Sequence, residues 1–440
     1  MTGYWTRLDY NSWGRTISVP HEVASPRFPD EIAGLLSDNS GHTTLPVGLR
    51  RSYGDSNLNP NERLIDMTGL DRLIEFDRST GILRCEAGIS LHQLNQILVP
   101  SGWFMPTTPG TRFVTLGGAI ANDVHGKNHH SAGSIGCAVR ALTLARSDGT
   151  LQPIRSGDPL FLATLGGMGL TGVIVDAEIQ LSRIGSAWLE NERIAFSSVG
   201  DFFKLAHEST AFEHTVAWID CAAQGPKLGR GVFQRANWCN DGEYAAPKKG
   251  AEPSLPLDFP QWALNRHSIR VFNNFYNWMQ TRGSAVRREH YQPFFYPLDS
   301  LRNWNRMYGA AGFYQYQCVI PTEAAKEAVT RLLQTISASG QGSFLAVLKT
   351  LGGKSSGGML SFPMEGATMA LDFANRGAKT LHLMAQLDVI VAQADGRLYP
   401  AKDGRMPARM FRAGYPLWRE FATFKDPKIQ SSFWERVSKS

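Results

Sequence analysis

Apolar and polar residues alternate with a period of about two through much of the first third of the chain, which predicts short β-strands. Between Leu64 and Gly88, the runs LIDM, LIEFD and GILRCEAG are separated by turn residues, and we expect short antiparallel strands there. Two further runs, VRALTLAR and TLQPI, flank Ser147-Asp148-Gly149 and predict a β-hairpin. The first third is therefore expected to be rich in small sheets.

Other segments show the spacing of three to four residues that is typical of amphipathic helices. Ser90 and Gln93 form a predicted capping box at the start of one of them, and Gly340 is the expected stop of another. In chain order the expected helices are 29–36, 91–98, 322–336 and 381–393.

The second half of the chain contains longer strand candidates, beginning near Ser186. In GFYQYQCVIP, the side chains of Gln315 and Gln317 alternate with apolar ones, and the segment 359–373 predicts further strands with a turn at Gly366. A segment rich in Pro, Gly and Lys lies between Asn240 and Phe259 and predicts a mobile loop or lid. We place this lid at about 240–283.

The composition is that of an ordinary globular protein of 440 residues, with 42% apolar and 19% charged residues, long enough for two or three domains. No apolar run reaches the roughly 18 residues of a membrane span, and the first residues lack the apolar core of a secretory signal. The five cysteines are scattered without C-x-x-C spacing, which is typical of reduced thiols. We therefore expect a cytoplasmic protein.

A net charge of +6 is compatible with anionic small ligands or with peripheral contact to an anionic lipid surface. The chain has no run of basic residues interleaved with aromatic ones, so we expect no nucleic-acid binding.

Glycines and histidines are concentrated between Pro109 and Gly136, where six glycines, three histidines and Lys127 fall within one stretch. Glycine permits close approach of the backbone to a ligand, so we interpret this stretch as the floor of a cofactor site. A metal site is not expected, because the glycines and Ser131 disfavour a helix that would carry two histidines one turn apart. Arg50 and Arg51 form a polar turn that suits phosphate binding, although a solvated loop is the alternative.

Gly167, Gly169 and Gly172 match the G-x-G-x-x-G fingerprint of dinucleotide-binding folds. The fingerprint requires a helix after it, whereas a β-branched, strand-like run begins at Val173. We therefore exclude a Rossmann domain.

Several blocks of the sequence resemble the vanillyl-alcohol oxidase-like flavoproteins and, within them, the oxidases of decaprenylphosphoryl-β-D-ribose. The blocks that carry this resemblance are GLRRSYGDSN (48–57), LIDMTGL (64–70), PGTRFVTLGGAIANDVHGKNHHSAGS (109–134), GLTGVI (169–174), YPLDSLRNWNRMYGAAGFYQYQCVIPTEA (296–324), SFPMEG (361–366) and GRLYPAKD (396–403). The resemblance implies a two-domain α+β fold, with an FAD-binding domain at 1–184 and 397–440 and a substrate-binding domain at 185–396.

The resemblance also implies which residues hold FAD. The expected cofactor-binding residues are Arg50, Arg51, Ser52, Tyr53, Gly54, Asp55, Gly110, Thr111, Gly117, Gly118, Asn122, His125, Gly126, Gly169, Gly172, Ile174 and Tyr399. Related sugar-alcohol oxidases carry a histidine near the position of Arg51 that bonds covalently to the flavin. Because this chain has arginine there, FAD is expected to bind non-covalently.

The catalytic residues implied by the resemblance are Lys402, Tyr53 as base and His125 as an orienting group. The implied substrate-binding residues are Gln317, Lys349, Lys127, Tyr399, Gln315 and Trp218, with Lys127 and Lys349 available to a sugar phosphate. Several of these have simpler interpretations. Lys402 resembles a surface charge in a loop, the two glutamines resemble the exposed face of an edge strand, and Trp218 resembles core or lid packing.

The implied reaction is oxidation of the 2-hydroxyl of decaprenylphosphoryl-β-D-ribose, or of a similar polyprenyl-phosphoryl pentose, by hydride transfer to flavin N5. A separate NAD-dependent reductase would complete the epimerisation to the arabinose form. Ala370 stands where many family members have cysteine, which leaves another sugar or lipid chain open. The alternatives are an FAD-dependent oxidase of a free alditol, sugar lactone or other alcohol, and a non-catalytic basic binding protein on the same fold.

Overall fold

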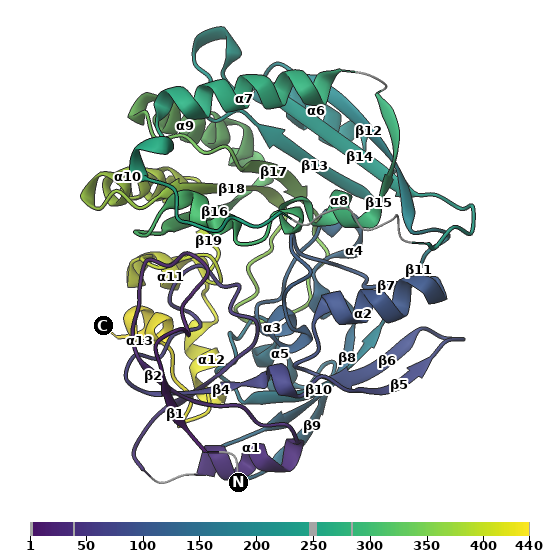
Figure 1. Ribbon diagram of the computed structural model, residues 1–440, viewed down its shortest axis with the longest axis vertical. Helices are drawn as coiled ribbons and strands as arrows, with labels where there is room; N and C mark the ends of the chain where they lie inside the picture. The colour runs from purple at the N-terminus through teal and green to yellow at the C-terminus, as the bar shows by residue number, and fades with distance from the viewer. Residues whose placement is uncertain (1–2, 38–39, 246–252, 283–284, 440) are drawn as a thin grey trace.

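The computed structural model describes residues 3–37, 40–245, 253–282 and 285–439, and the strands within these residues form four sheets (Figure 1). The lower half of the molecule in Figure 1 holds a four-stranded and a five-stranded sheet, and the upper half holds an eight-stranded sheet. A two-stranded sheet, made of β7 (Trp103–Phe104) and β11 (Ser182–Arg183), is the smallest of the four.

The two lower sheets come mainly from the first 180 residues. The four-stranded sheet has the order β1 (Trp5–Arg7), β2 (His21–Ala24), β4 (Arg63–Asp66), β3 (Thr44–Val47). The five-stranded sheet is antiparallel throughout, in the order β5 (Leu73–Asp77), β6 (Ile82–Glu86), β10 (Val173–Gln180), β8 (Val139–Ala145), β9 (Leu151–Arg155).

The upper sheet is also antiparallel throughout and is built from strands between Trp188 and Leu398. Its order is β15 (Val286–His290), β12 (Trp188–Phe196), β14 (Gly231–Trp238), β13 (His214–Ile219), β17 (Ala346–Leu351), β18 (Gly366–Ala374), β16 (Phe313–Pro321), β19 (Arg397–Leu398). We propose that this sheet and its helices are the substrate-binding domain expected at 185–396.

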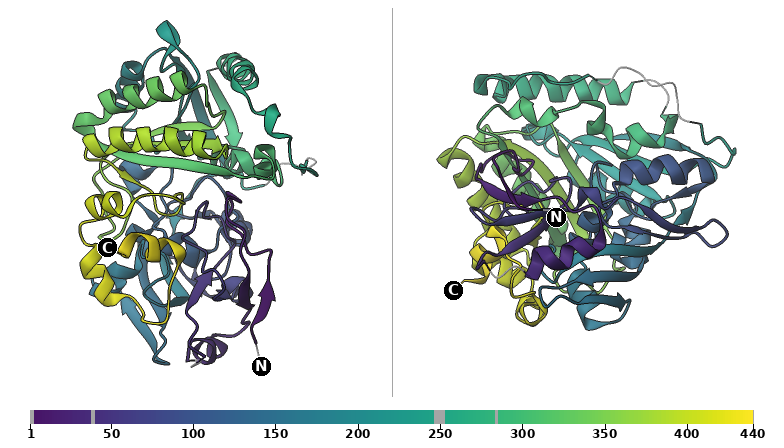
Figure 2. Two further views of the ribbon diagram at one scale, coloured as in Figure 1. Left: turned by 90° about the vertical axis from the view of Figure 1, so that its left-hand side faces the viewer. Right: turned by 60° about the horizontal axis from the view of Figure 1, so that its bottom comes forward.

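Helices cover the two faces of the upper sheet unequally. Two long helices, α9 and α10, pack on one face, and α7 lies on the other, as the left view of Figure 2 shows. The helices are α1 (Pro29–Ser37), α2 (Leu91–Leu98), α3 (Leu116–Ala121), α4 (His129–Ala132), α5 (Pro159–Thr164), α6 (Val199–Glu208), α7 (Arg266–Thr281), α8 (Tyr291–Phe295), α9 (Thr322–Ser339), α10 (Ala378–Gln393), α11 (Ala408–Gly414), α12 (Trp418–Phe424) and α13 (Ser432–Ser438). The last three return to the lower half.

Most elements predicted from local pattern are confirmed. The Ser90 hydroxyl accepts a hydrogen bond from the Gln93 amide at 3.2 Å, and the Gln93 side chain accepts one from the Ser90 amide at 2.9 Å, so the capping box starts α2. The helix predicted at 322–336 continues to Ser339, where Gly340 adopts a left-handed conformation with φ of 70°. The expected hairpin is the pair β8 and β9, and β10 follows the G-x-G-x-x-G run as a strand.

Two expectations about local structure are wrong. The run LIDM forms β4, which pairs in parallel with β2 and β3 because chain crossovers bring it between them. Within 359–373 only β18 is a strand, and Gly366 is its first residue rather than a turn, because Pro363 cannot donate to a ladder. The lid expected at 240–283 stays a prediction: helix α7 lies within it, and residues 246–252 and 283 of that segment lie outside the described residues.

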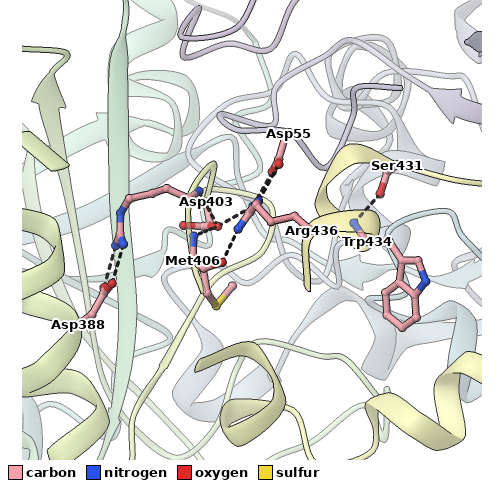
Figure 3. A network of polar contacts seen from close by, with 8 residues as sticks. Asp55, Asp388, Asp403, Met406, Ser431, Trp434 and Arg436 are labelled. Carbon is pink, nitrogen blue, oxygen red and sulfur yellow. Dashed lines mark hydrogen bonds and ion pairs between the residues drawn. The ribbon is translucent and has the colours of Figure 1, made fainter. Parts of the chain in front are cut away.

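The chain's two ends are joined by a buried ion-pair network (Figure 3). Arg436 of α13 donates hydrogen bonds to both oxygens of Asp55, at 2.9 and 2.7 Å, and to Asp403 at 3.0 Å. Both carboxylates are 6% exposed. Because Asp403 follows Lys402 directly, this network fixes the loop that presents Lys402.

We expect Arg436→Met to destabilise the protein by about 3–5 kcal/mol, because it leaves two buried carboxylates without their cation. The measurement is the free energy of unfolding from urea titration. Arg140→Met is the matched control, because the Arg140–Glu178 pair is largely exposed. Loss of the Arg140–Glu178 pair should lower the free energy of unfolding by at most about 1 kcal/mol. Equal effects of the two substitutions would contradict a structural role of the network.

Candidate functional site

A cavity of about 1260 Å³ is enclosed by residues from both halves of the molecule. Its walls are the loop after β3, the segment 108–115, the first turn of α3, the loop before β10, the inner face of the upper sheet, α7 and the segment 399–402. Pockets for single drug-sized ligands usually occupy about 300–1,000 Å³. The cavity therefore has room for a dinucleotide together with a second molecule.

The glycine positions keep the lower wall thin. A Cβ atom on Gly48 would lie 2.2 Å from the Thr115 hydroxyl oxygen, and one on Gly117 would lie 2.9 Å from the Ala87 Cβ. A Cβ on Gly110 would meet nothing within 4 Å. Backbone packed this closely leaves space for a flat ligand next to main-chain groups.

Most of the expected cofactor-binding residues line this cavity. Those that do are Arg50, Arg51, Ser52, Tyr53, Gly110, Thr111, Gly117, Gly118, Asn122, His125, Gly126, Gly169, Gly172, Ile174 and Tyr399. Arg50 has a φ of 54° and its guanidinium lies 4.1 Å from the Tyr10 ring centroid, while that of Arg51 lies 4.1 Å from the Trp13 ring centroid. Both arginines are thus positioned by aromatic rings.

Gly54 and Asp55 are the exceptions, because neither lines the cavity. A Cβ on Gly54 would lie 1.7 Å from the carbonyl oxygen of Asp403, so this glycine serves close packing against the segment 403–404. Asp55 turns away to pair with Arg436. Their expected contact with FAD stays a prediction, and the structure places both residues at the junction that supports the site.

Polar atoms without a protein partner lie in the same wall. The buried Ser56 hydroxyl, both amide atoms of Asn57 and Nδ1 of His125 make no hydrogen bond within the protein, and all three residues line the cavity. Buried polar groups are usually satisfied, so these atoms suit a ligand rich in donors and acceptors. The lining therefore fits a nucleotide cofactor.

The upper wall is one face of three neighbouring strands. Gln315 and Gln317 of β16, Lys349 of β17 and Asp372 of β18 all line the cavity. Because β16 pairs with β18 on one side and with β19 on the other, it is not an edge strand, so this simpler interpretation of the glutamines is wrong. The Gln317 amide nitrogen lies 3.0 Å from Nε2 of His125 and 3.3 Å from the Thr368 hydroxyl.

Three lysines project into the cavity from different elements. Lys127 donates to the carbonyl of Phe294, and Lys349 donates to the carbonyl of Gly126 at 3.1 Å. The Lys402 ammonium lies 4.0 Å from the ring centroid of Tyr53. Burial lowers the pKa of Lys127 to about 7 and those of Lys349 and Lys402 to about 8, because the low-dielectric surroundings disfavour a charge.

The two other expected catalytic groups are neutral. Burial and the nearby Lys349 hold the pKa of His125 well below its usual value. Burial and the nearby Asp372 raise the pKa of Tyr53 well above 10. Tyr53 is therefore a phenol that donates a hydrogen bond rather than a ready base.

Asp372 is a site residue that sequence reasoning missed. It is buried, accepts a hydrogen bond from the Gln315 amide at 2.6 Å, and lies 3.4 Å from the Tyr308 hydroxyl. Burial raises its pKa to about 7, while its charge raises that of Lys402. Ala370 had drawn attention to this strand, and its alternation places Asp372 on the same face.

Tyr399 and Trp218 line the cavity but also have structural partners. The Tyr399 hydroxyl donates to the carbonyl of Asn122 at 2.8 Å, and its ring stacks on Phe362. The indole of Trp218 donates to the carbonyl of Phe344 at 3.1 Å and lies 4.9 Å from the ring of Tyr276 in α7. Among the described residues no group of three or more His, Cys, Asp or Glu side chains could hold a metal ion.

Comparisons with known proteins agree with this arrangement. Residues 20–155 match the model of an FAD binding domain. The chain is 36% identical over 429 residues to decaprenylphosphoryl-beta-D-ribose oxidase of Mycolicibacterium smegmatis, which covers 92% of this chain and 90% of that protein. It is also 30% identical to an uncharacterized protein of Streptomyces coelicolor, over 77% of this chain and 96% of that one.

A more distant similarity is confined to part of the chain. L-gulono-1,4-lactone dehydrogenase of Mycobacterium tuberculosis is 25% identical over 174 residues, which is 39% of this chain and 40% of that protein. The described helices include none that is both long enough and apolar enough to span a bilayer.

We expect Lys402 to contribute a positive slope to the free energy of unfolding of the FAD-free protein between pH 8 and 10. In this window the unfolded chain binds a proton at Lys402 (ordinary pKa 10.5), whereas the folded chain, with a pKa of about 8, has released it. Lys402→Met should lower the slope by up to about 1.4 kcal/mol per pH unit. Urea titrations at several pH values measure this slope, with the exposed Lys379→Met as control. An unchanged slope in Lys402→Met would show that the lysine titrates normally.

Proposed function

The chain belongs to the family of FAD-binding oxidases that includes decaprenylphosphoryl-beta-D-ribose oxidase, and we propose that it oxidises the 2-hydroxyl of decaprenylphosphoryl-β-D-ribose, or of a closely similar polyprenyl-phosphoryl pentose, to the 2-keto form. As an FAD-dependent oxidoreductase, it acts with a cofactor that supplies the hydride acceptor when bound. The observation that carries the proposal is that one cavity contains both the residues expected to bind FAD and, facing them, Gln317, Lys349 and Lys402.

In this proposal Lys402 takes the proton of the reacting hydroxyl. Its low pKa makes the neutral amine available near pH 8, whereas Tyr53 stays protonated. Tyr53 donates a hydrogen bond to the sugar, and His125, placed by Gln317, orients it. Arg51 takes the place of the covalent histidine of related oxidases, so FAD is held non-covalently.

The substrate phosphate is assigned to Lys127 and Lys349. Both ammonium groups lie in the cavity and donate to backbone carbonyls, and a phosphodiester would offset the cost of burying their charge. Gln315, Tyr399 and Trp218 complete the proposed wall, and Ala370 leaves room where a larger side chain would stand.

The 2-keto product requires a second step, because epimerisation needs reduction of the ketone from the opposite face. We assign that step to a separate NAD-dependent reductase, and we place the enzyme in the cytoplasm, close to the membrane that holds the lipid. The second candidate function is oxidation of a free alditol or sugar lactone, which the partial similarity to L-gulono-1,4-lactone dehydrogenase favours.

Anaerobic mixing of the FAD-loaded protein with substrates distinguishes these functions. We expect decaprenylphosphoryl ribose to bleach the flavin absorbance, and free alditols or sugar lactones at equal concentration to leave it nearly unchanged. Bleaching by a free sugar alcohol alone would support the second candidate and exclude the first. A protein that binds no FAD at all would be a non-catalytic binding protein.

The pH dependence of flavin reduction tests the assignment of Lys402. The rate should rise with pH as the amine loses its proton, and Lys402→Met should lower it by roughly 10²–10⁴-fold. Asp372→Asn removes an anion that raises the pKa of Lys402. The rise of the rate with pH should therefore move to lower pH. Stopped-flow absorbance at several pH values measures both effects. If the rate of Asp372→Asn rose over the same pH range as that of the wild type, a group other than Lys402 would determine the pH dependence.

A further inference from the structure

Helix α7 exposes a continuous apolar stripe to solvent. Val271, Phe275 and Trp278 are 69%, 57% and 47% exposed, and Met279 extends the row. Residues spaced by four, three and one fall on one side of a helix, so these side chains form a single surface. The Phe275 and Trp278 rings stack at 5.8 Å. Trp262, just before the helix, is 77% exposed and adds to this surface.

The opposite side of α7 contains polar anchors. Asn273 is fully buried and donates to Asp220 at 2.7 Å, and Arg193 donates to Gln280 at the end of the helix. Ile269 and Tyr276 point to the cavity side. The helix is therefore held in an orientation that leaves its apolar stripe in water, and an exposed apolar patch of this kind marks a contact surface.

The charged side chains in the sequence segment that contains the stripe are all positive. Between Asp258 and Glu289 the sequence has five arginines and neither aspartate nor glutamate, compared with a net charge of +6 for the whole chain. Arg270, next to Val271 in the sequence, is exposed, and the Arg282 guanidinium lies 4.0 Å from the Trp278 ring centroid. An apolar face of Trp, Phe and Val flanked by arginines is typical of helices that lie in the interface of an anionic bilayer.

The stripe is continuous with the mouth of the cavity. Phe272 and Phe259 both line the cavity and are 43% and 40% exposed, so the cavity reaches the surface beside the stripe. The right view of Figure 2 shows α7 along the outer edge of the upper half. Arginine side chains and an open apolar mouth thus share one surface.

We propose that this surface, made of Trp262, Val271, Phe275, Trp278 and Met279 with the flanking Arg270 and Arg282, docks on an anionic lipid bilayer. The stripe enters the interface, the arginines contact lipid phosphates, and the cavity mouth faces the acyl chains. A substrate with a polyprenyl tail can then enter while its tail stays in lipid. Only this last step rests on the proposed function.

Co-sedimentation of the full-length, FAD-loaded protein with vesicles tests the docking. We expect binding to vesicles of phosphatidylglycerol and phosphatidylcholine, weak binding to phosphatidylcholine alone, and weaker binding at high salt because the arginines are screened. The double substitution Phe275→Ser/Trp278→Ser should lower the bound-to-free ratio by at least about tenfold, since both exposed rings are lost from the interface. Arg270→Glu should reduce the preference for the anionic vesicles.

Trp5→Ser/Leu151→Ser is the matched control, because these side chains are 74% and 49% exposed on other elements. It should bind vesicles as the wild type does. Flavin content and the thermal midpoint verify that each variant is folded. Equal vesicle binding by the Phe275/Trp278 variant and the wild type would overturn the proposal. So would a change from dimer to monomer in that variant without lipid, which would identify the surface as a contact between two copies.

Substrate oxidation separates this inference from the proposed function. The Phe275/Trp278 variant should reduce its flavin normally with a detergent-dispersed short-chain substrate, but at least about tenfold more slowly with substrate embedded in vesicles. If the protein bound vesicles but neither the dispersed nor the embedded substrate reduced its flavin, the docking surface would be supported and the proposed substrate would be wrong. If the variant and the wild type oxidised vesicle-embedded substrate at equal rates, the docking surface would be wrong and the proposed substrate would be supported.

Discussion

The cost of burying positive charge is the constraint on which this site depends. Among the described residues that line the cavity, six are arginines or lysines and two are aspartates. Each buried ammonium loses hydration, which a carbonyl oxygen replaces only in part at Lys127 and Lys349 and the Tyr53 ring only in part at Lys402, so the pKa values of all three lysines fall. A ligand with phosphate groups removes part of this cost, so the folded protein and its anionic ligands stabilise one another.

The alternation of side chains along the strands brings the polar residues of the upper wall together. Gln315 pairs in register with Asp372, and Gln317 pairs with Ala370, so polar side chains of β16 and β18 stand next to one another on the cavity face. Tyr316 and Cys318 point the other way and pack in the core together with side chains of α9. One short stretch of sequence thus supplies both the reactive wall and the apolar core that holds it in place.

Local pattern predicted the helices with clear caps and the hairpin, because their signals lie within a few residues of each other. Most of the residues that the resemblance implies for FAD binding line one cavity. Asp372 could not be identified as easily, because its importance arises from Lys402 and Gln315, which lie on other strands. Helix α7 was missed for a physical reason: its apolar side faces outward and its buried side contains Asn273, the inverse of the usual pattern.

Tertiary ion pairs explain the remaining differences. Asp55 lies within a predicted phosphate-binding turn, yet its partner Arg436 is 381 residues away, and nothing near Asp55 in the sequence indicates that contact. The parallel pairing of β4 likewise depends on chain crossovers that periodicity does not encode.

The junction of Asp55, Asp403 and Arg436 also sets an order for biosynthesis. The first segment of the cofactor wall emerges from the ribosome early, but the cation that neutralises Asp55 and the loop that holds Lys402 emerge only after the whole upper sheet. The upper sheet, whose strands are nearly contiguous in sequence, can assemble while the earlier segments wait for their partners. The cavity wall that contains Arg50, Arg51 and Lys402 is therefore completed late, after α13 has been made.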